Sequence, residues 1–462
     1  MFILSSQAIS TFQQLNNSTV TQTHNYMQII KNPSRTDWTD LLKRPAFESE
    51  KLFDTVKTIL ENVRKNGDKA LIEYALQFDK ASLNMLQVSE MEIAEAEEQV
   101  PRSLKEAISQ AKRNIEKFHE AQDNELPCLE IIPEVRCWQK RTPVQKVGLY
   151  IPGGTAPLFS TVLMLAVPAQ IAGCEEIILC TPPDKEGKIH PAILHTAHLC
   201  GVTKIFKTGG AQAIAAMAYG TETVPRVYKI FGPGNQYVTA AKQLVSLQQV
   251  AIDMPAGPSE VAIIADHTAN PRYIAADMLS QAEHGVDSQA LLVTTDEPLI
   301  EQVTEEIKMQ LSELPRKAIA EKALENSKII YLPKIEDAID LLNEYAAEHL
   351  IIATHNYTVV SERIINAGSV FMGSYSPESA GDYASGTNHT LPTSGYAKAY
   401  SGVSLDSFTK KITFQELSRE GLSMLSNAIE IMAENEQMLA HKNAVEVRLE
   451  RTYREENNRN RG

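Results

Sequence analysis

Short apolar runs alternate with helical stretches from about residue 145 onward, and no other feature constrains the fold as strongly. The runs occupy residues 147–151, 176–180, 228–231, 261–265, 291–294, 350–353 and 370–372. Strands buried on both faces form continuous apolar runs, and intervening helices are typical of parallel sheets covered by helices. Because the number of runs fits two sheets, we predict an α/β fold with two Rossmann-like parallel-sheet domains, residues 145–260 and 261–400.

Both flanks of this region have the residue spacing of helices. Apolar residues recur three or four positions apart in residues 49–122 and again after residue 417, as in amphipathic helices. We predict a helical N-terminal segment, residues 27–144, that packs on the second α/β domain. We also predict a small helical C-terminal segment, residues 401–449.

The two ends and the overall charge limit the possible partners. Residues 1–26 contain no Asp, Glu, Lys or Arg and are expected to be a disordered extension, unless translation begins at Met27; residues 450–462 are expected to be a charged tail. A net charge of -14 argues against nucleic-acid binding and leaves a small molecule as the expected partner. The sequence has no apolar run of about 20 residues and no secretory signal, so we expect a cytoplasmic protein outside the membrane.

Three glycine-rich stretches follow apolar runs, at residues 151–155, 208–212 and 231–235. Glycine lets backbone N–H groups approach a pyrophosphate closely, so these stretches could bind a dinucleotide. The usual G-x-G-x-x-G motif is absent from the sequence. From spacing alone, cofactor loops and tight structural turns both remain open.

Two histidine patterns could mark a metal site, and each is weak alone. Gln281 and His284 share one face of an expected helix that ends at Gly285, and side chains three residues apart can bind one metal ion. His195, His198 and Cys200 fall in an ordinary helix without a nearby carboxylate. We interpret this second group as structural.

Glu348 and His349 stand side by side where an apolar run begins. Adjacent side chains point to opposite faces of a strand, whereas at a turn both can reach one cavity. Either group could act as a base in proton transfer. The residues alone leave a catalytic and a structural role equally open.

Eight segments together resemble those of one family. They are residues 148–154 (GLYIPGG), 208–214 (TGGAQAI), 231–235 (FGPGN), 253–260 (DMPAGPSE), 279–285 (LSQAEHG), 347–350 (AEHL), 385–392 (SGTNHTLP) and 440–445 (AHKNAV). Their order and sequences resemble the histidinol dehydrogenase family, and they extend over most of residues 27–449. Eight ordered matches are far more specific than any single motif.

The resemblance implies one zinc ion per subunit, held by Gln281, His284, Asp382 and His441. With one carboxylate among these ligands, the bound ion would keep a net positive charge and attract neutral nitrogen donors. A substrate imidazole and amine could complete its coordination, so the metal would mainly anchor the substrate. The family's substrate contacts correspond to Ser259, Gln281, His284, His349, Asp382, Glu436 and His441.

The resemblance also implies the reaction, in which L-histidinol is oxidised through L-histidinaldehyde to L-histidine and two NAD are reduced. These are the last steps of histidine biosynthesis. His349 would take the hydroxyl proton, and Glu348 would activate water for the second oxidation. The family's NAD contacts correspond to Tyr150, Gln212 and Asn235, and the missing G-x-G-x-x-G motif is a family trait.

The family's quaternary structure and its relatives complete these expectations. Family members are homodimers with shared active sites, so we expect Glu436 and His441 to come from the partner chain. A relative with the same fold could oxidise another small alcohol, such as a sulfonated propanediol, but Glu436, His441 and the match at residues 253–260 favour histidinol. A catalytically silent binding or regulatory protein is a further alternative, although no expected ligand or base is missing.

Overall fold

The computed structural model describes residues 20–21, 27–44, 49–153, 156–247, 250–255 and 257–450. The chain divides into a main unit, residues 1–122 and 144–408, and a small unit, residues 123–143 and 409–462. Most of the predicted N-terminal extension and charged tail lie outside the described residues. Within the described part, no helix combines the length and the apolar character needed to cross a membrane.

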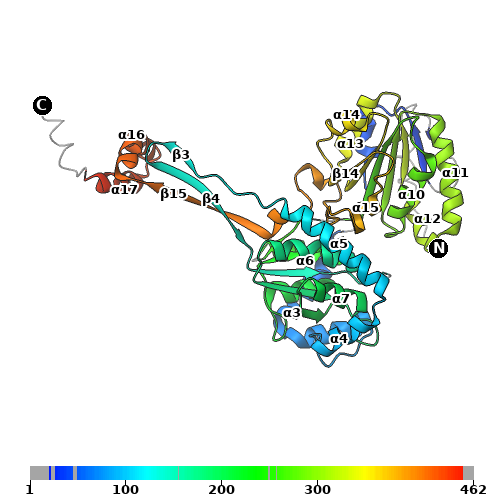
Figure 1. The fold of residues 1–462 in the computed structure, drawn as a ribbon, viewed down its shortest axis with the longest axis horizontal. Coiled ribbons are helices and arrows are strands. Elements are labelled where there is room, and N and C mark those ends of the chain that lie inside the picture. Colours follow the sequence, from blue (N-terminus) through cyan, green and yellow to red (C-terminus); the bar gives the residue numbers. More distant parts are fainter. Residues whose placement is uncertain are drawn as a thin grey trace. The chain divides into compact units, whose positions relative to one another are not determined.

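The first sheet of the main unit has five parallel strands in the order β7-β6-β5-β8-β9 (Figure 1). The strands are β5 (Lys146–Tyr150), β6 (Glu176–Thr181), β7 (Lys204–Lys207), β8 (Lys229–Phe231) and β9 (Ala251–Ile252). One face is covered by α3 (Ser49–Tyr74), α8 (Gly210–Tyr219) and α9 (Gln236–Ser246), the other by α4 (Glu90–Gln99), α5 (Arg102–Glu120), α6 (Phe159–Ile171) and α7 (Pro191–Leu199). The strand order reverses between β5 and β8, which is where such sheets bind ligands, outside the carboxyl ends of the strands.

The second sheet has seven strands in the order β1-β2-β12-β11-β10-β13-β14, parallel except for the pair β1 and β2. The strands are β1 (Val20–Thr21), β2 (Gln28–Lys31), β10 (Glu260–Ala265), β11 (Gln289–Thr294), β12 (Lys328–Tyr331), β13 (His349–Ala353) and β14 (Ser369–Met372). One face packs on α10 (Pro271–Ala282), α11 (Pro298–Glu313) and α12 (Lys317–Glu325), the other on α2 (Trp38–Leu41), α13 (Ile335–Tyr345) and α14 (Tyr357–Ser361). The short helix α15 (Glu378–Tyr383) follows β14.

The helices of the N-terminal segment pack on the first sheet, so the prediction that residues 27–144 pack on the second α/β domain was wrong for most of the segment. Val56, Leu60 and Val63 of α3 share a core with the alanines of α8, while α4 and α5 contact α7 and α6. Of the described residues of this segment, β2 pairs with β12 and α2 packs on one face of the second sheet. An apolar stripe indicates that a helix is covered, but it does not identify the sheet that covers it.

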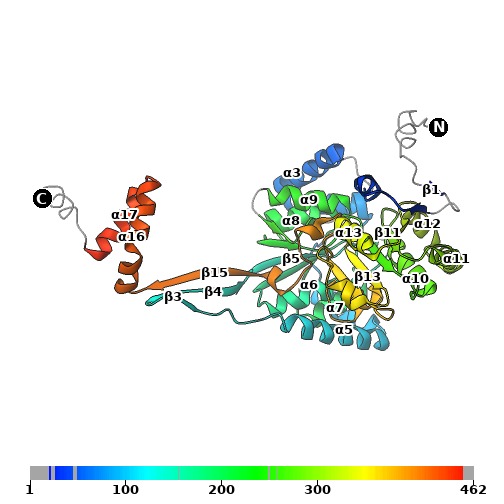
Figure 2. The same ribbon diagram turned by 90° about the horizontal axis from the view of Figure 1, so that it is seen from above.

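The small unit contains three antiparallel strands in the order β15-β4-β3 (Figure 2). Its elements are β3 (Leu129–Ile132), β4 (Val135–Pro143), β15 (Thr409–Leu417), α16 (Arg419–Asn435) and α17 (Leu439–Glu446). The predicted helical N-terminal and C-terminal segments therefore also contribute strands, which the prediction did not include. The side chains of β15 are almost all exposed, so this strand lacks the apolar run that marks a buried one.

Candidate active site

Glu348 and His349 lie where β13 begins, beside Glu260, the first residue of β10. The two strands are parallel neighbours whose register places Val261 opposite His349. Parallel strands begin at one edge of a sheet, so the residues that open them are brought together there. All three side chains are buried, with 8% of Glu348, 4% of His349 and 3% of Glu260 exposed.

Carboxylates surround both ring nitrogens of His349. Its Nδ1 lies 3.3 Å from the Glu260 carbonyl oxygen and 3.7 Å from Glu348 Oε2, and Glu378 Oε1 is 3.8 Å away. Its buried Nε2 lies 3.5 Å from Asp382 Oδ1 and has no hydrogen-bond partner among the described residues. Burial lowers the pKa of His349, but the surrounding negative charges, that of Glu378 first, outweigh this effect and raise the pKa to about 10.

Glu348 is the second titratable group of this cluster with a strongly shifted pKa. Burial raises the pKa of Glu348 to about 8, although the neighbouring His349 and a hydrogen bond from Glu260 lower it. In that bond, the Glu260 N–H donates to Glu348 Oε2 over 2.9 Å. Shifted pKa values of an adjacent acid and base in a buried site are typical of catalytic groups.

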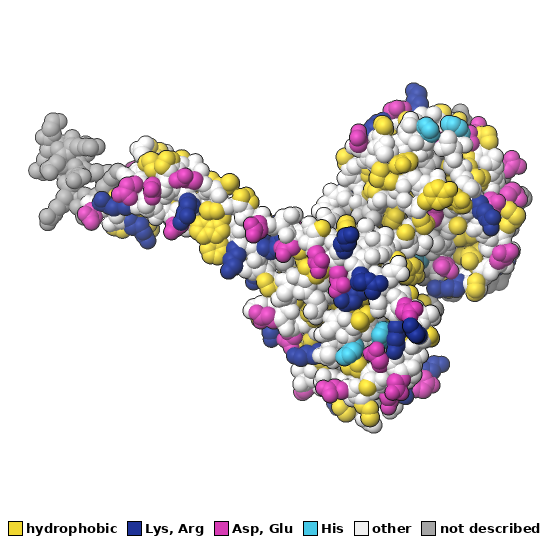
Figure 3. Space-filling view, in the orientation of Figure 1, with side chains coloured by type: hydrophobic (Ala, Val, Ile, Leu, Met, Phe, Trp, Pro, Cys, Tyr) yellow, Lys and Arg dark blue, Asp and Glu magenta, His cyan; other side chains and the backbone are white. Residues whose placement is uncertain are grey.

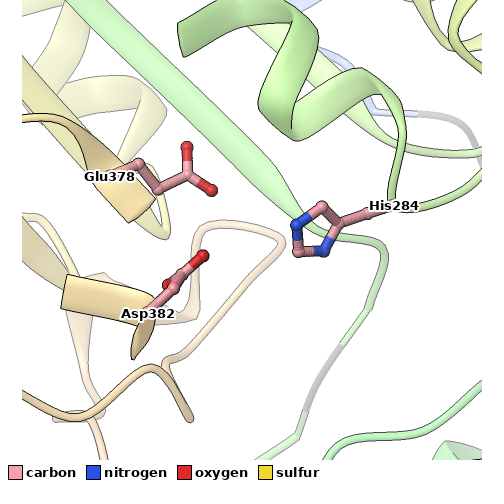
Figure 4. A group of neighbouring side chains, drawn as sticks. All are labelled: His284, Glu378 and Asp382. Carbon is pink, nitrogen blue, oxygen red and sulfur yellow. The ribbon is translucent and has the colours of Figure 1, made fainter. Parts of the chain in front are cut away.

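His284, Glu378 and Asp382 converge from α10 and α15 (Figure 4). Glu378 and Asp382 are one helical turn apart on α15, and His284 follows the end of α10 with its ring directed toward both carboxylates. Each residue offers one ligand atom, and these atoms all lie within 4.8 Å of one another. Nitrogen and oxygen donors at this spacing could hold a divalent cation.

Gln281 is completely buried and adds an amide to this group. Oriented with its nitrogen toward Glu378, the amide donates a hydrogen bond of 2.7 Å to Glu378 Oε1. The structure therefore brings three of the four predicted ligands, Gln281, His284 and Asp382, into one cluster whose donor atoms suit zinc.

The other predicted substrate and metal contacts are Ser259, Glu436 and His441. Ser259 directly precedes Glu260 and is half-buried. Glu436 follows α16 and His441 lies in α17, so both belong to the small unit, and both are exposed.

Two acidic residues of the cluster were not assigned a site role from the sequence. Glu378 could have been found, because Pro377 precedes a short helix in which Glu378 and Asp382 are four residues apart. Glu260 gave no such signal, because its role depends on contacts with residues far away in the sequence. His195 is buried inside α7, but Glu97 Oε1 lies 3.4 Å from its Nδ1, so the expectation that no carboxylate lies nearby was wrong, and the structural role of this histidine stays a prediction.

A cavity of about 1070 Å³ lies at the carboxyl ends of the first sheet, and Tyr150, Gln212 and Asn235 line it. Tyr150 ends β5, and its hydroxyl accepts a hydrogen bond of 3.0 Å from the N–H of Gly210, the first residue of α8. The Asn235 side chain caps the N-terminus of α9. Two helix N-termini at one cavity favour an anionic ligand such as a pyrophosphate.

The loop after β8 is held in place by a buried ion pair between Lys242 and Asp253. Asp253 accepts a hydrogen bond of 2.8 Å from the Gly232 N–H, and Lys242 donates one of 2.9 Å to the Gly232 carbonyl. Gly232 has a φ of 127°, and a Cβ atom there would collide with the Tyr150 carbonyl oxygen. Only glycine allows this close approach between the loop and β5.

The fold and its two sites define an α/β protein with a cavity at the carboxyl ends of one sheet and a buried acid–imidazole cluster on the other. Residues 42–449 match the family described as histidinol dehydrogenase. The chain belongs to this family.

Individual relatives support the same assignment. The chain is 66% identical to the histidinol dehydrogenase of Bacteroides thetaiotaomicron over 92% of its own length and 99% of the relative. It is 53% identical to that of Escherichia coli K12, over 88% and 94% of the two chains. The crystal structure of histidinol dehydrogenase from Elizabethkingia anophelis superposes with a TM-score of 0.91 at 55% identity, covering 93% of this chain and 99% of that one.

Proposed function

We propose that the protein oxidises L-histidinol through L-histidinaldehyde to L-histidine, with two NAD reduced per substrate. The observation that carries the proposal is the buried Glu348–His349 pair beside Gln281, His284 and Asp382, in a chain that matches the family over residues 42–449. The cavity lined by Tyr150, Gln212 and Asn235 supports NAD binding, because all three predicted contacts meet there.

His349 is the proposed base for the hydroxyl proton, and its surroundings select the reacting atom. Nδ1 faces the Glu260 carbonyl oxygen at 3.3 Å, so a proton on Nδ1 would be shared with that acceptor and leave the Nε2 lone pair free. The Asp382 carboxylate, 3.5 Å from Nε2, would stabilise the imidazolium that forms. Glu348 then takes a proton from the water that attacks the aldehyde.

Gln281, His284 and Asp382 would hold a zinc ion, with His441 as a fourth ligand. When bound, the ion would anchor the substrate's nitrogens and offset the negative charges that raise the pKa of His349, and this favours the neutral imidazole. The chain's own residues would still hold and move the protons.

We also propose a homodimer in which each small unit completes the partner's site. Among the described residues of the small unit, the buried apolar side chains are those of Val135, Ala433 and Val445. Its exposed large hydrophobic residues include Leu129, Ile131, Ile412, Phe414, Met424, Ile431, Met432, Met438 and Leu439, and Figure 3 shows hydrophobic side chains on the surface of this unit. Such apolar surface indicates a protein contact, and it lies on the unit that carries Glu436 and His441.

The first test counts NADH formed by the purified, zinc-loaded protein with limiting L-histidinol. We expect two NADH per histidinol, loss of activity after chelation and recovery when zinc is restored. The His349→Ala protein, purified identically, controls for contaminating dehydrogenases. Absence of NADH with histidinol, despite bound zinc and NAD, would contradict the proposed function.

A further inference from the structure

The backbone of one residue, Glu260, contacts both members of the Glu348–His349 pair. Its N–H donates to Glu348 Oε2 over 2.9 Å, and its carbonyl oxygen lies 3.3 Å from His349 Nδ1. The two groups belong to the peptide planes on either side of the Glu260 Cα, so a shift of this one residue would disturb both catalytic side chains at once.

The Glu260 side chain is itself held by an arginine from the N-terminal segment. Arg44 Nε and Nη2 donate to the two Glu260 carboxylate oxygens over 2.6 and 2.8 Å, and the Ser394 N–H donates to Oε1 over 2.6 Å. Only 3% of the Glu260 side chain and 18% of the Arg44 side chain are exposed. A two-point bond between a guanidinium and a carboxylate fixes direction as well as distance.

Arg44 is anchored in turn to the end of α13. Its Nη2 donates to the Tyr345 carbonyl oxygen over 2.6 Å, and its guanidinium carbon lies 4.0 Å from the centre of the Tyr345 ring. The Tyr345 hydroxyl donates to Gln289 Oε1 over 2.7 Å, at the start of β11. The arginine therefore links the chain before α3, the end of α13 and the opening of β10.

We propose that the Arg44–Glu260 ion pair is a positioning element that fixes the Glu260 backbone and, through it, the orientation of Glu348 and His349. A buried ion pair is costly to desolvate and adds little net stability relative to apolar residues of the same volume. Net stability therefore does not explain why this ion pair is present, whereas positioning of the Glu260 backbone does. This inference rests on the proposed function, because it assumes that Glu348 and His349 are the groups that transfer protons.

Three variants separate positioning from stability. Arg44→Lys keeps the charge but removes the two-point bond, Arg44→Met leaves Glu260 without its cation, and the double variant Arg44→Met with Glu260→Gln removes both charges. For zinc-loaded protein we expect kcat to fall about 100-fold in all three, as for misplaced catalytic groups. Because the double variant leaves no unpaired charge, we expect its thermal stability to recover while its kcat stays low.

The matched control is Arg35→Ala. Arg35 lies nine residues earlier in the same segment and pairs with Asp337 and Asp340 of α13, but it is exposed and has no contact with Glu260 among the hydrogen bonds and ion pairs of the described residues. We expect its kcat to stay within about twofold of the unmodified protein. Zinc affinity, measured by competition with a chromogenic chelator, should be unchanged in every variant, because none of these residues is a proposed ligand.

The double variant gives the decisive comparison. If its kcat per folded, zinc-loaded site recovers together with its thermal stability, the proposal is wrong. Crystal structures give a readout that does not depend on the reaction. We expect the Glu260–Glu348 hydrogen bond or the Glu260–His349 contact to be broken in Arg44→Met; if both are retained, the positioning role is wrong, whatever the substrate is. Failure of the proposed function would instead appear as a lack of NADH formation by the unmodified protein.

Discussion

His284 and His349 differ in their surroundings, and the difference predicts separate defects. His284 is exposed and offers a ligand atom within 4.8 Å of those of Glu378 and Asp382, whereas His349 is buried and its Nε2 has no hydrogen-bond partner among the described residues. We expect His284→Ala to lower both zinc affinity and kcat. His349→Ala should lower kcat about 100-fold or more and leave zinc affinity nearly unchanged. Chelator competition and steady-state kinetics measure the two effects, and equal zinc loss in both variants would contradict these roles.

Glu348 should matter most in the second oxidation. Glu348→Gln keeps an oxygen that can accept the Glu260 N–H but cannot take a proton from water. With histidinaldehyde as the substrate, we expect at least about a 100-fold lower rate, whereas oxidation of histidinol to the aldehyde should fall much less. Burial raises the pKa of Glu348, so the unmodified enzyme should oxidise the aldehyde faster as the pH rises and the carboxylate forms. An equal loss in the two half-reactions would assign Glu348 another role.

The sequence predicted part of this site, and its limits have a physical cause. Spacing paired Gln281 with His284, although α10 ends at Ala282 and not at Gly285, so that His284 lies just after the helix, and adjacency placed Glu348 beside His349. The approach of α15 to α10, and of Glu260 to His349, depends on strand register and loop path. These are long-range properties that no local pattern contains.

At the scale of elements, the β8–α9 loop gives a clear prediction. Gly232→Ala would place a methyl group against the Tyr150 carbonyl oxygen and should destabilise the fold by about 3 kcal/mol or more and weaken NAD binding. Gly173→Ala is the matched control, because Gly173 also has positive φ but its Cβ would meet nothing within 4 Å. Thermal unfolding and NAD titration measure stability and NAD affinity in both variants. Equal losses in the two would show that the positive φ, and not the contact with Tyr150, causes the defect.

Strands that are buried at every residue could be predicted. Strands β10 and β11 are buried at every residue, and both were found as apolar runs. Strand β15 pairs with β4 over nine residues, yet its side chains are mostly exposed. Exposed strands and helices share polar compositions, so the sequence of the small unit did not distinguish them.

At the scale of the whole molecule, a shared active site can be tested by subunit complementation. His349→Ala and His441→Ala should each be inactive as homodimers. After unfolding and refolding together in equal amounts, half of the dimers carry both variants and each of these has one intact site, so about a quarter of the normal activity should return. If His441 served the site of its own chain, both sites of each mixed dimer would retain one defect, and no activity would return.

The position of strand β2 in the sequence affects when the second sheet can form during synthesis. Gln28 pairs with Lys328, so this strand leaves the ribosome 300 residues ahead of its neighbour, and the complete first sheet lies between them. The first sheet can close during synthesis, while the edge of β2 that pairs with β12 stays open until β12 emerges. A sheet that joins such distant segments folds late and slowly, so the nascent chain depends on protection of β2 during that interval.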